Sequence, residues 1–441
     1  MPAKAGKAPA REPTFSDRLE GLLPAYLGRQ RWHNGGPPKT ATVLDHHEIV
    51  EGLQWLLVVA DDSTYQVVVG TRPAGVPPAF LHGHDDALIG ESDGLIYYDA
   101  VVDPSLALSL LGVVVPGEVA DHVRPMGVEQ SNTSLVYDDR VVLKLFRRVR
   151  PGANPDVEVT NALAKAGFAH VAAPLGVWRR GGHDLAVAQP FLAGAADGWA
   201  MALTSLRDLY ATECDDPADC GGDFAGDAAR LGDVTARMHL ALAQAFATGP
   251  GDGDAWAAMA ETQLERLQPG DADSDAARRF VARLRTAKHV GKAIRVHGDY
   301  HLGQVMQAEG TWYVLDFEGE PVRSMEERAA QSSPLKDVAG MLRSLHYAAS
   351  VALSEQDPTR QADLASLAVS WEARNRRAFI DGYLAQAVGS DLLPTEPSSF
   401  EAVLGAFELD KAVYEVLYER GHRPDWVGIP QAAIRRLLSG T

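Results

Sequence analysis

The most informative stretch of the chain runs from residue 297 to residue 321 and reads HGDYHLGQVMQAEGTWYVLDFEGEP. Its first part places Asp299 in a turn after Gly298, where a carboxylate can project into a cleft. Its second part is an apolar strand, WYVL, followed by Asp316 and Glu318, which point to the same side if the strand geometry continues. Either half alone is a weak signal, but HGDxHxxQ followed twelve residues later by Asp-Phe-Glu is much more specific.

These residue types are the ones that phosphoryl transfer from ATP requires. The reaction needs a carboxylate that orients and deprotonates the attacking hydroxyl group, and oxygen ligands that hold Mg²⁺ against the phosphates. Asp299 can be the base, while Gln304 and Asp316 can suffice as metal ligands, because Mg²⁺ takes few protein oxygens and fills its shell with phosphate and water. The stretch therefore predicts an enzyme that uses ATP and Mg²⁺.

The chain on either side of this stretch divides into three predicted segments. Residues 1–95 form a small α+β unit with one amphipathic helix at 16–29 and three strands, and we expect it to cap the rest as a subdomain. Residues 96–195 are β-rich and are predicted to bind the nucleotide, whereas residues 196–441 follow a mostly helical pattern around the hairpin quoted above. A β-rich lobe joined to a helical lobe suits a nucleotide in the cleft.

Composition narrows the class of protein and its partners. With 46% hydrophobic and 23% charged residues, the 441-residue chain is globular and not disordered. Its net charge of −18 disfavours nucleic acid and anionic membranes as partners. No apolar run is long enough for a membrane helix and no signal peptide is visible, so we expect a cytoplasmic protein, and we expect a monomer. Cys214 and Cys220, its two cysteines, are interpreted as free thiols in a surface loop.

The HGDxHxxQ…DxE pattern resembles the catalytic loop and metal-binding segment of the aminoglycoside-phosphotransferase and choline-kinase-like superfamily. Gln304 stands where that superfamily usually has Asn, which narrows the resemblance to the actinobacterial maltokinase family. Further similar segments are EQSNTSLV (129–136), NPDVEV (154–159), ELDKAVYEVLYE (408–419) and RPDW (423–426). The resemblance implies an α+β, eukaryotic-kinase-like bilobal fold, with a β-rich N-lobe that carries an N-terminal cap subdomain and a mostly helical C-lobe.

The resemblance also implies a role for each matching residue. Asp299 is expected to be the base that receives the sugar hydroxyl proton. The expected metal ligands are Gln304, Asp316 and Glu318. Lys144 is expected to position the phosphates and to pair with Glu158 on the next helix. The loop expected to cover the phosphates consists of Gln130, Ser131, Asn132, Thr133 and Ser134.

Sugar recognition should use polar groups held in a fixed geometry, because a hydrogen-bonding site discriminates strongly between hydroxyl patterns. The candidates are His301, Asp337, Arg343, Glu408, Lys411, Tyr414 and Arg423. Glu408, Lys411 and Tyr414 are spaced three apart and would share one helix face.

Two sugars stay open as acceptors. The resemblance implies ATP-dependent conversion of maltose to maltose 1-phosphate, a product that feeds α-glucan (glycogen) synthesis, and the intact ELDKAVYE segment favours this interpretation. A related group in the same family phosphorylates glucosamine, at C6, and an acidic site lined by Asp299, Glu408 and Asp410 would suit that cationic acceptor. A kinase-like binding module without activity is a third hypothesis, and an aminoglycoside-resistance enzyme is a weaker fourth.

Overall fold

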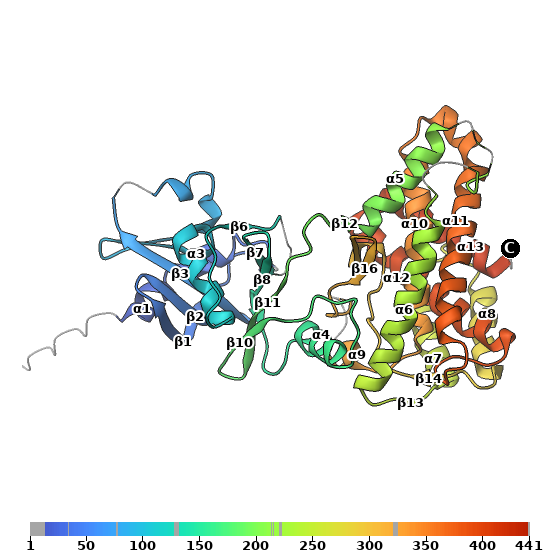
Figure 1. Ribbon diagram of the computed structural model, residues 1–441, viewed down its shortest axis with the longest axis horizontal. Helices are drawn as coiled ribbons and strands as arrows, with labels where there is room; N and C mark the ends of the chain where they lie inside the picture. The colour runs from blue at the N-terminus through green and yellow to red at the C-terminus, as the bar shows by residue number, and fades with distance from the viewer. Residues whose placement is uncertain are drawn as a thin grey trace, which may run out of the picture. The chain divides into compact units, whose positions relative to one another are not determined.

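The computed structural model describes residues 14–33, 35–75, 78–127, 132–212, 214, 216–219, 223–320 and 325–439. The chain divides into two compact units, each described here by itself (Figure 1). Unit 1 consists of Met1–Val157 and Ala173–Ala193, and unit 2 consists of Glu158–Ala172 and Gly194–Thr441. Unit 1 therefore contains nearly all of the two segments predicted at 1–95 and 96–195, and unit 2 contains the predicted helical segment.

The first sheet of unit 1 is antiparallel, with strand order β1-β2-β3-β5-β4 and β9 paired to β3. Its strands are β1 (Ala41–Val50), β2 (Leu53–Ala60), β3 (Ser63–Pro73), β4 (Leu88–Ser92), β5 (Leu95–Asp99) and β9 (Arg148–Val149). The three strands predicted before residue 73 are confirmed. The sheet continues four residues past the boundary predicted at residue 95, because β5 pairs with both β3 and β4.

The helix predicted at 16–29 is wrong as a single element. The structure has two short helices there, α1 (Phe15–Glu20) and α2 (Leu23–Leu27). The first ends at Gly21, and Pro24 lies in the first turn of the second, where its missing N–H costs no hydrogen bond. Both helices still bury the predicted apolar stripe, since Leu19, Leu23 and Leu27 belong to the core beneath the first sheet.

The second sheet of unit 1 has strand order β10-β11-β8-β7-β6. Its strands are β6 (Val123–Pro125), β7 (Asn132–Tyr137), β8 (Val141–Phe146), β10 (Gly176–Arg180) and β11 (His183–Pro190). Helix α3 (Pro104–Val114) packs on this sheet through Leu110, Leu111 and Val114, and the hydroxyl of Tyr137 donates to the carbonyl of Ala107 at 2.8 Å. This packing fixes β7, which carries the predicted phosphate-binding residues Asn132, Thr133 and Ser134, and β8, which carries Lys144.

Buried polar contacts tie the two sheets of unit 1 together. Arg147 is 1% exposed, and its guanidinium lies 2.7 Å from the carboxylate of Asp99 at the end of β5. The same carboxylate accepts a 2.6 Å hydrogen bond from Tyr26 on α2. Gln66 on β3 donates to the carbonyl of Phe146 at 2.6 Å. Since these partners come from both predicted N-terminal segments, the segment predicted as a cap and the β-rich segment form one unit.

Unit 2 is built mainly of helices. They are α5 (Gly198–Ala211), α6 (Ala225–Ala245), α7 (Gly253–Leu264), α8 (Ser274–Thr286), α9 (Met325–Ala329), α10 (Leu335–Ser354), α11 (Pro358–Ala387), α12 (Pro397–His422) and α13 (Gly428–Ser439). Helix α4 (Pro155–Lys165) begins in unit 1 and continues in unit 2. Helices α6 and α11 lie side by side (Figure 1), and Gly232 makes this possible, because a Cβ atom there would lie 2.1 Å from the carbonyl oxygen of Phe379.

Two small sheets interrupt the helices of unit 2. One pairs β12 (Ala196–Asp197), β15 (Val305–Ala308) and β16 (Thr311–Val314) in the order β12-β15-β16, and the other pairs β13 (Gly249–Pro250) with β14 (Lys292–Ala293). The hairpin β15–β16 confirms the strands predicted in the stretch 297–321. It places the residues before β15 and after β16 at the same end of the hairpin, since Val305 pairs with Val314.

The structure bears on two predictions made from the sequence, one about the cysteines and one about membrane helices. Cys214 is disulfide-bonded, so the interpretation of two free thiols is wrong. The only other cysteine, Cys220, lies outside the described residues. A low cysteine count therefore does not exclude a disulfide bond. Across the part of the chain that the structure describes, no helix combines the length and apolarity that a membrane crossing needs.

Candidate active site

The loop that carries Asp299 is held in place by a buried carboxylate, that of Asp337 in the first turn of α10. This carboxylate accepts hydrogen bonds from the backbone N–H of His297 at 2.8 Å and of Gly298 at 2.9 Å, and it lies 3.1 Å from Nε2 of His239. Burial raises the pKa of Asp337, but these donors outweigh burial and hold the pKa below its usual value. Asp337 therefore stays ionised and fixes the loop backbone, a role that the sequence did not predict.

His297 connects this loop to the segment that follows β16. Its Nδ1 accepts from the backbone N–H of Asp299 at 3.4 Å, so its Nε2 is the protonated nitrogen that donates to the carbonyl of Leu315 at 2.9 Å. Between these residues Gly298 adopts a φ of +87°, which residues with a side chain rarely adopt. The predicted base and the predicted metal ligand Asp316 are thus anchored by the two nitrogens of one buried ring.

The carboxylate of Asp299 has two oxygens in different surroundings. Oδ1 accepts from the ammonium of Lys411 on α12 at 3.2 Å, and that ammonium also donates to Oε1 of Glu320 at 2.8 Å. Oδ2 lies 4.0 Å from Nε2 of His301, beyond hydrogen-bonding distance, and accepts no hydrogen bond from the described residues. Burial lowers the pKa of His301, which favours its neutral form. Lys411 therefore holds Oδ1 of Asp299, the predicted base, and Oδ2 can receive a proton.

Gln304 and Asp316 come together at the end of the hairpin. Nε2 of Gln304 lies 3.4 Å from Oδ2 of Asp316, and the backbone N–H of Leu315 donates to the carbonyl of Gln304 at 2.9 Å. Asp316 has a φ of +60°, a strained conformation that often marks a functional position. Glu318 lies next to it and donates its backbone N–H to Oδ1 of Asp316 at 3.4 Å. An amide and a carboxylate that converge in this way fit Mg²⁺, which needs only one or two such ligands beside phosphate and water.

Lys144 lies on β8 of unit 1, opposite Ser134 on β7. Its ammonium lies 3.4 Å from Oδ2 of Asp156, whose side chain is 5% exposed. Asp156 is held by Asn154, whose side-chain oxygen accepts from the backbone N–H of Asp156 at 2.9 Å. Asp156 is not among the residues predicted from the sequence, although it lies in the segment NPDVEV (154–159) at the start of a helix.

The other predicted nucleotide-binding residues are only partly described. Glu158, two residues after Asp156, is exposed, and within unit 2 its charge opposes the lowering of the Arg295 pKa by burial. Asn132, Thr133 and Ser134 lie on β7, and Oγ1 of Thr133 accepts from Arg147 at 2.8 Å. Gln130 and Ser131 lie outside the described residues.

Three predicted sugar-binding residues are engaged in ion pairs. Their closest polar contacts are Glu408 with Arg376 at 2.8 Å, Arg343 with Glu415 at 2.7 Å, and Arg423 with Glu419 at 2.7 Å. Glu408 and Arg343 are buried by these contacts, while the Arg423 side chain is 47% exposed and lies 4.3 Å from the centre of the Trp426 ring. Glu408 and Lys411 lie on the same helix, but Glu408 pairs with Arg376, whereas Lys411 pairs with Asp299 and Glu320.

Lys411 and Tyr414, by contrast, lie together near the catalytic loop. The ammonium of Lys411 is 4.8 Å from the centre of the Tyr414 ring, and burial raises the pKa of Tyr414 to about 12. The structure brings Asp299, His301, Lys411 and Tyr414 into one neighbourhood.

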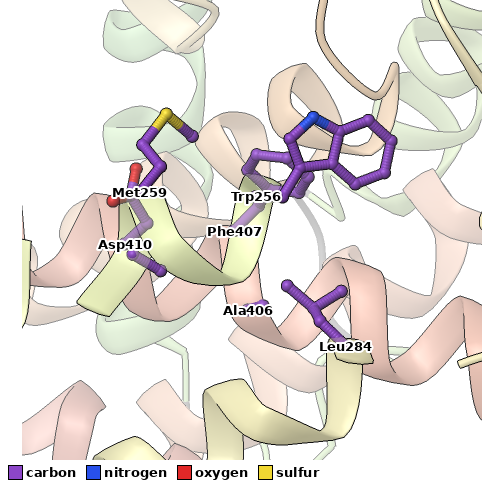
Figure 2. Close-up of a pocket in the computed structure, with 7 residues that line it drawn as sticks. Trp256, Met259, Leu284, Ala406, Phe407 and Asp410 are labelled. Carbon is purple, nitrogen blue, oxygen red and sulfur yellow. The ribbon is translucent and has the colours of Figure 1, made fainter. Parts of the chain in front are cut away.

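A small cavity with room for about one water molecule lies beside this loop. It is lined by Gly298, Tyr300, Glu320, Lys336, Asp337, Gly340, Phe407, Asp410 and Lys411. A second gap, shown in Figure 2, is too small to hold a water molecule and is enclosed mainly by apolar side chains such as Trp256 and Leu284. Phe407 and Asp410 line both spaces, so one face of α12 separates a polar cavity from an apolar one.

Comparison with known proteins identifies the family. The profile of the phosphotransferase enzyme family matches residues 122–359, and that of the maltokinase N-terminal cap domain matches residues 26–103. A protein named glucosamine kinase from Streptacidiphilus jiangxiensis is 30% identical over 338 residues, which are 70% of this chain and 72% of that protein. Another protein of that name, from Mycolicibacterium smegmatis, is 29% identical over 343 residues, which are 73% of this chain and 81% of that protein.

Solved structures show the same fold over nearly the whole chain. A glucosamine kinase in complex with glucosamine, ADP and inorganic phosphate matches with a TM-score of 0.71 at 24% identity, covering 97% of this chain and 100% of that one. A second crystal form of a glucosamine kinase gives a TM-score of 0.73 with the same coverage. The predicted α+β, eukaryotic-kinase-like fold is thereby confirmed. The chain belongs to the phosphotransferase enzyme family and carries the maltokinase-type N-terminal cap domain, as the sequence motifs predicted.

Proposed function

We propose that the protein is an ATP-dependent sugar kinase whose acceptor is glucosamine, phosphorylated on the C6 hydroxyl group. The observation that carries the proposal is the carboxylate of Asp299, held at Oδ1 by Lys411 and with no hydrogen bond from the described residues at Oδ2, next to a small cavity that Glu320, Asp337 and Asp410 help to line. The two similar proteins from Streptacidiphilus jiangxiensis and Mycolicibacterium smegmatis, both named glucosamine kinase, support the choice of acceptor.

In this reaction Asp299 orients the acceptor hydroxyl group and takes its proton on Oδ2, while Lys144 positions the phosphates of ATP. Gln304 and Asp316, with help from Glu318, would hold Mg²⁺, which when bound neutralises charge on the phosphates. His297 holds Asp299 and Asp316 in fixed positions, because its two ring nitrogens hydrogen-bond to the backbone of Asp299 and to that of Leu315, the residue before Asp316. Asp337 keeps the loop rigid while the proton moves.

The charges around the cavity favour an acceptor that carries an ammonium group. Glu320, Asp337 and Asp410 line it, against the two ammonium groups of Lys336 and Lys411. Asp410 belongs to this lining and is 6% exposed. Glu408, which was also expected to contribute, has both carboxylate oxygens engaged by one guanidinium nitrogen of Arg376.

Maltose is the second candidate acceptor, with maltose 1-phosphate as product and a place before α-glucan synthesis. The match of the maltokinase N-terminal cap domain to residues 26–103 favours it, as does the segment ELDKAVYE at 408–415. The position of the new phosphate separates the two candidates, because it lies on C6 of glucosamine and on the anomeric C1 of maltose.

A panel of acceptors tests the proposal. ADP release with MgATP is measured with glucosamine, N-acetylglucosamine, glucose and maltose, and phosphorus NMR locates the phosphate in the product. We expect turnover with glucosamine and at least a tenfold lower kcat/KM with N-acetylglucosamine, which has the same ring but no positive charge, because an ammonium–carboxylate contact is worth about 1.5–3 kcal/mol. Turnover with maltose but not glucosamine would favour the second candidate. No turnover with any sugar would contradict both and favour a binding module.

A further inference from the structure

Lys411 makes contacts that a residue which only recognises sugar would not need. It lies on α12, 112 positions after Asp299 in the sequence, yet its ammonium lies between the carboxylates of Asp299 and Glu320. Its side chain is 19% exposed, and that of Glu320 is 2% exposed. The ammonium group of Lys411 is therefore bound by two carboxylates, those of Asp299 and Glu320.

The charges of this cluster explain why the lysine can be buried. Burial alone would lower the pKa of Lys411, but the charges of Asp299 and Glu320 outweigh it and raise the pKa above its ordinary value. The lysine therefore remains a cation. A buried cation that already has two carboxylate partners stays with them, since leaving either carboxylate unpaired is costly.

The contact between the Lys411 ammonium and one oxygen of Asp299 also fixes the orientation of the Asp299 carboxylate. The terminal torsion of an aspartate is broad, so a carboxylate on a turn does not by itself present one defined oxygen to a substrate. In this structure the ammonium binds Oδ1, whereas Oδ2 accepts no hydrogen bond from the described residues. The carboxylate plane is thus defined, and a single oxygen is available to an acceptor hydroxyl group.

We propose that Lys411 is a positioning residue for the base: it holds Asp299 by Oδ1, is itself held by Glu320, and so directs Oδ2 to the hydroxyl group that is phosphorylated. The inference rests on the proposed function, in which Asp299 is the base. It replaces the expectation that Lys411 acts as a sugar ligand. The two roles predict different kinetics, because a positioning residue acts on kcat and a ligand of the bound sugar acts on KM.

The test compares Lys411→Ala with Lys292→Ala, a control on the surface of unit 2 whose ammonium pairs with the exposed Asp391. With glucosamine and MgATP, we expect Lys411→Ala to lower kcat about 10²-fold, as misplacement of a reacting group does, while the KM for glucosamine stays within about twofold. Lys292→Ala should keep wild-type kinetics. Methylammonium added to Lys411→Ala should restore part of kcat, because it can occupy the space of the missing ammonium, and it should not affect the wild type.

A second variant keeps the test decisive if Lys411→Ala does not fold. Glu320→Gln leaves Lys411 and Asp299 in place but removes the support of the ammonium, so we expect a smaller fall in kcat, about tenfold, again with little change in KM. A raised KM for glucosamine with unchanged kcat in either variant would overturn the inference and make Lys411 a sugar ligand. Absence of sugar turnover by the wild-type protein would instead refute the proposed function itself, and the inference would fall with it.

Discussion

At the scale of single residues, the buried ring of His297 links Asp299 to the segment that carries Asp316. The stretch 297–321 placed Asp299, Gln304 and Asp316 near one another, and the structure joins them through His297 and the hairpin. The stretch could not show that Lys411 binds Asp299, because the two residues are 112 positions apart and only the fold brings α12 to the loop.

The carboxylate of Asp156, next to Lys144, gives a second prediction for a single residue. We expect Asp156→Asn to raise the KM for MgATP on the order of tenfold, or about 1.4 kcal/mol, because the lysine loses the charge that holds it while the side chain keeps its shape. Steady-state kinetics at saturating sugar measures this. The exposed pair Asp139–Arg124 offers the control, since Asp139→Asn should leave the KM unchanged. A larger effect of Glu158→Gln than of Asp156→Asn would return the role to Glu158.

At the scale of elements, periodicity predicted the three N-terminal strands and the helical character of residues 196–441, but not where a helix breaks or how closely two helices pack. The helix predicted at 16–29 is divided because α1 ends at Gly21 and Pro24 lies in the first turn of α2, although the apolar stripe is continuous. In unit 2, α6 and α11 lie in the segment 196–441, for which a mostly helical pattern was predicted. That pattern did not show that Gly232 allows the two helix backbones to come close together. A glycine in a helical sequence does not reveal which other helix packs against it.

This close approach of α6 and α11 gives a stability prediction. Gly232→Ala should destabilise the protein by at least about 2 kcal/mol, because the new Cβ atom would lie 2.1 Å from a backbone oxygen of α11 and the helices must separate. Gly226→Ala, on the same helix, should be neutral or stabilising by up to about 1 kcal/mol, since its Cβ atom would meet nothing closer than 3.7 Å. Urea denaturation followed by circular dichroism compares the two. Equal unfolding midpoints would refute the packing argument.

At the scale of the whole molecule, the family and the fold class were predictable from the motifs, and the family profiles and the structural matches confirm them. The organisation within unit 1 was less predictable. Arg147 and Gln66 join the first sheet to the second as buried polar residues, and a sequence pattern gives no reason to bury an arginine until its partner Asp99 is in place. The predicted boundary at residue 95 therefore falls inside a unit that folds around both sheets.

The central claim is that Asp299 is the base of an ATP-dependent sugar kinase, and one comparison tests it most directly. ADP release with glucosamine and MgATP is measured for the wild-type protein and for Asp299→Asn, with nucleotide binding measured separately on both. The account predicts turnover by the wild type and a kcat at least about 10²-fold lower for the variant, with nucleotide affinity little changed. A variant that turns over glucosamine at nearly the wild-type rate would contradict it.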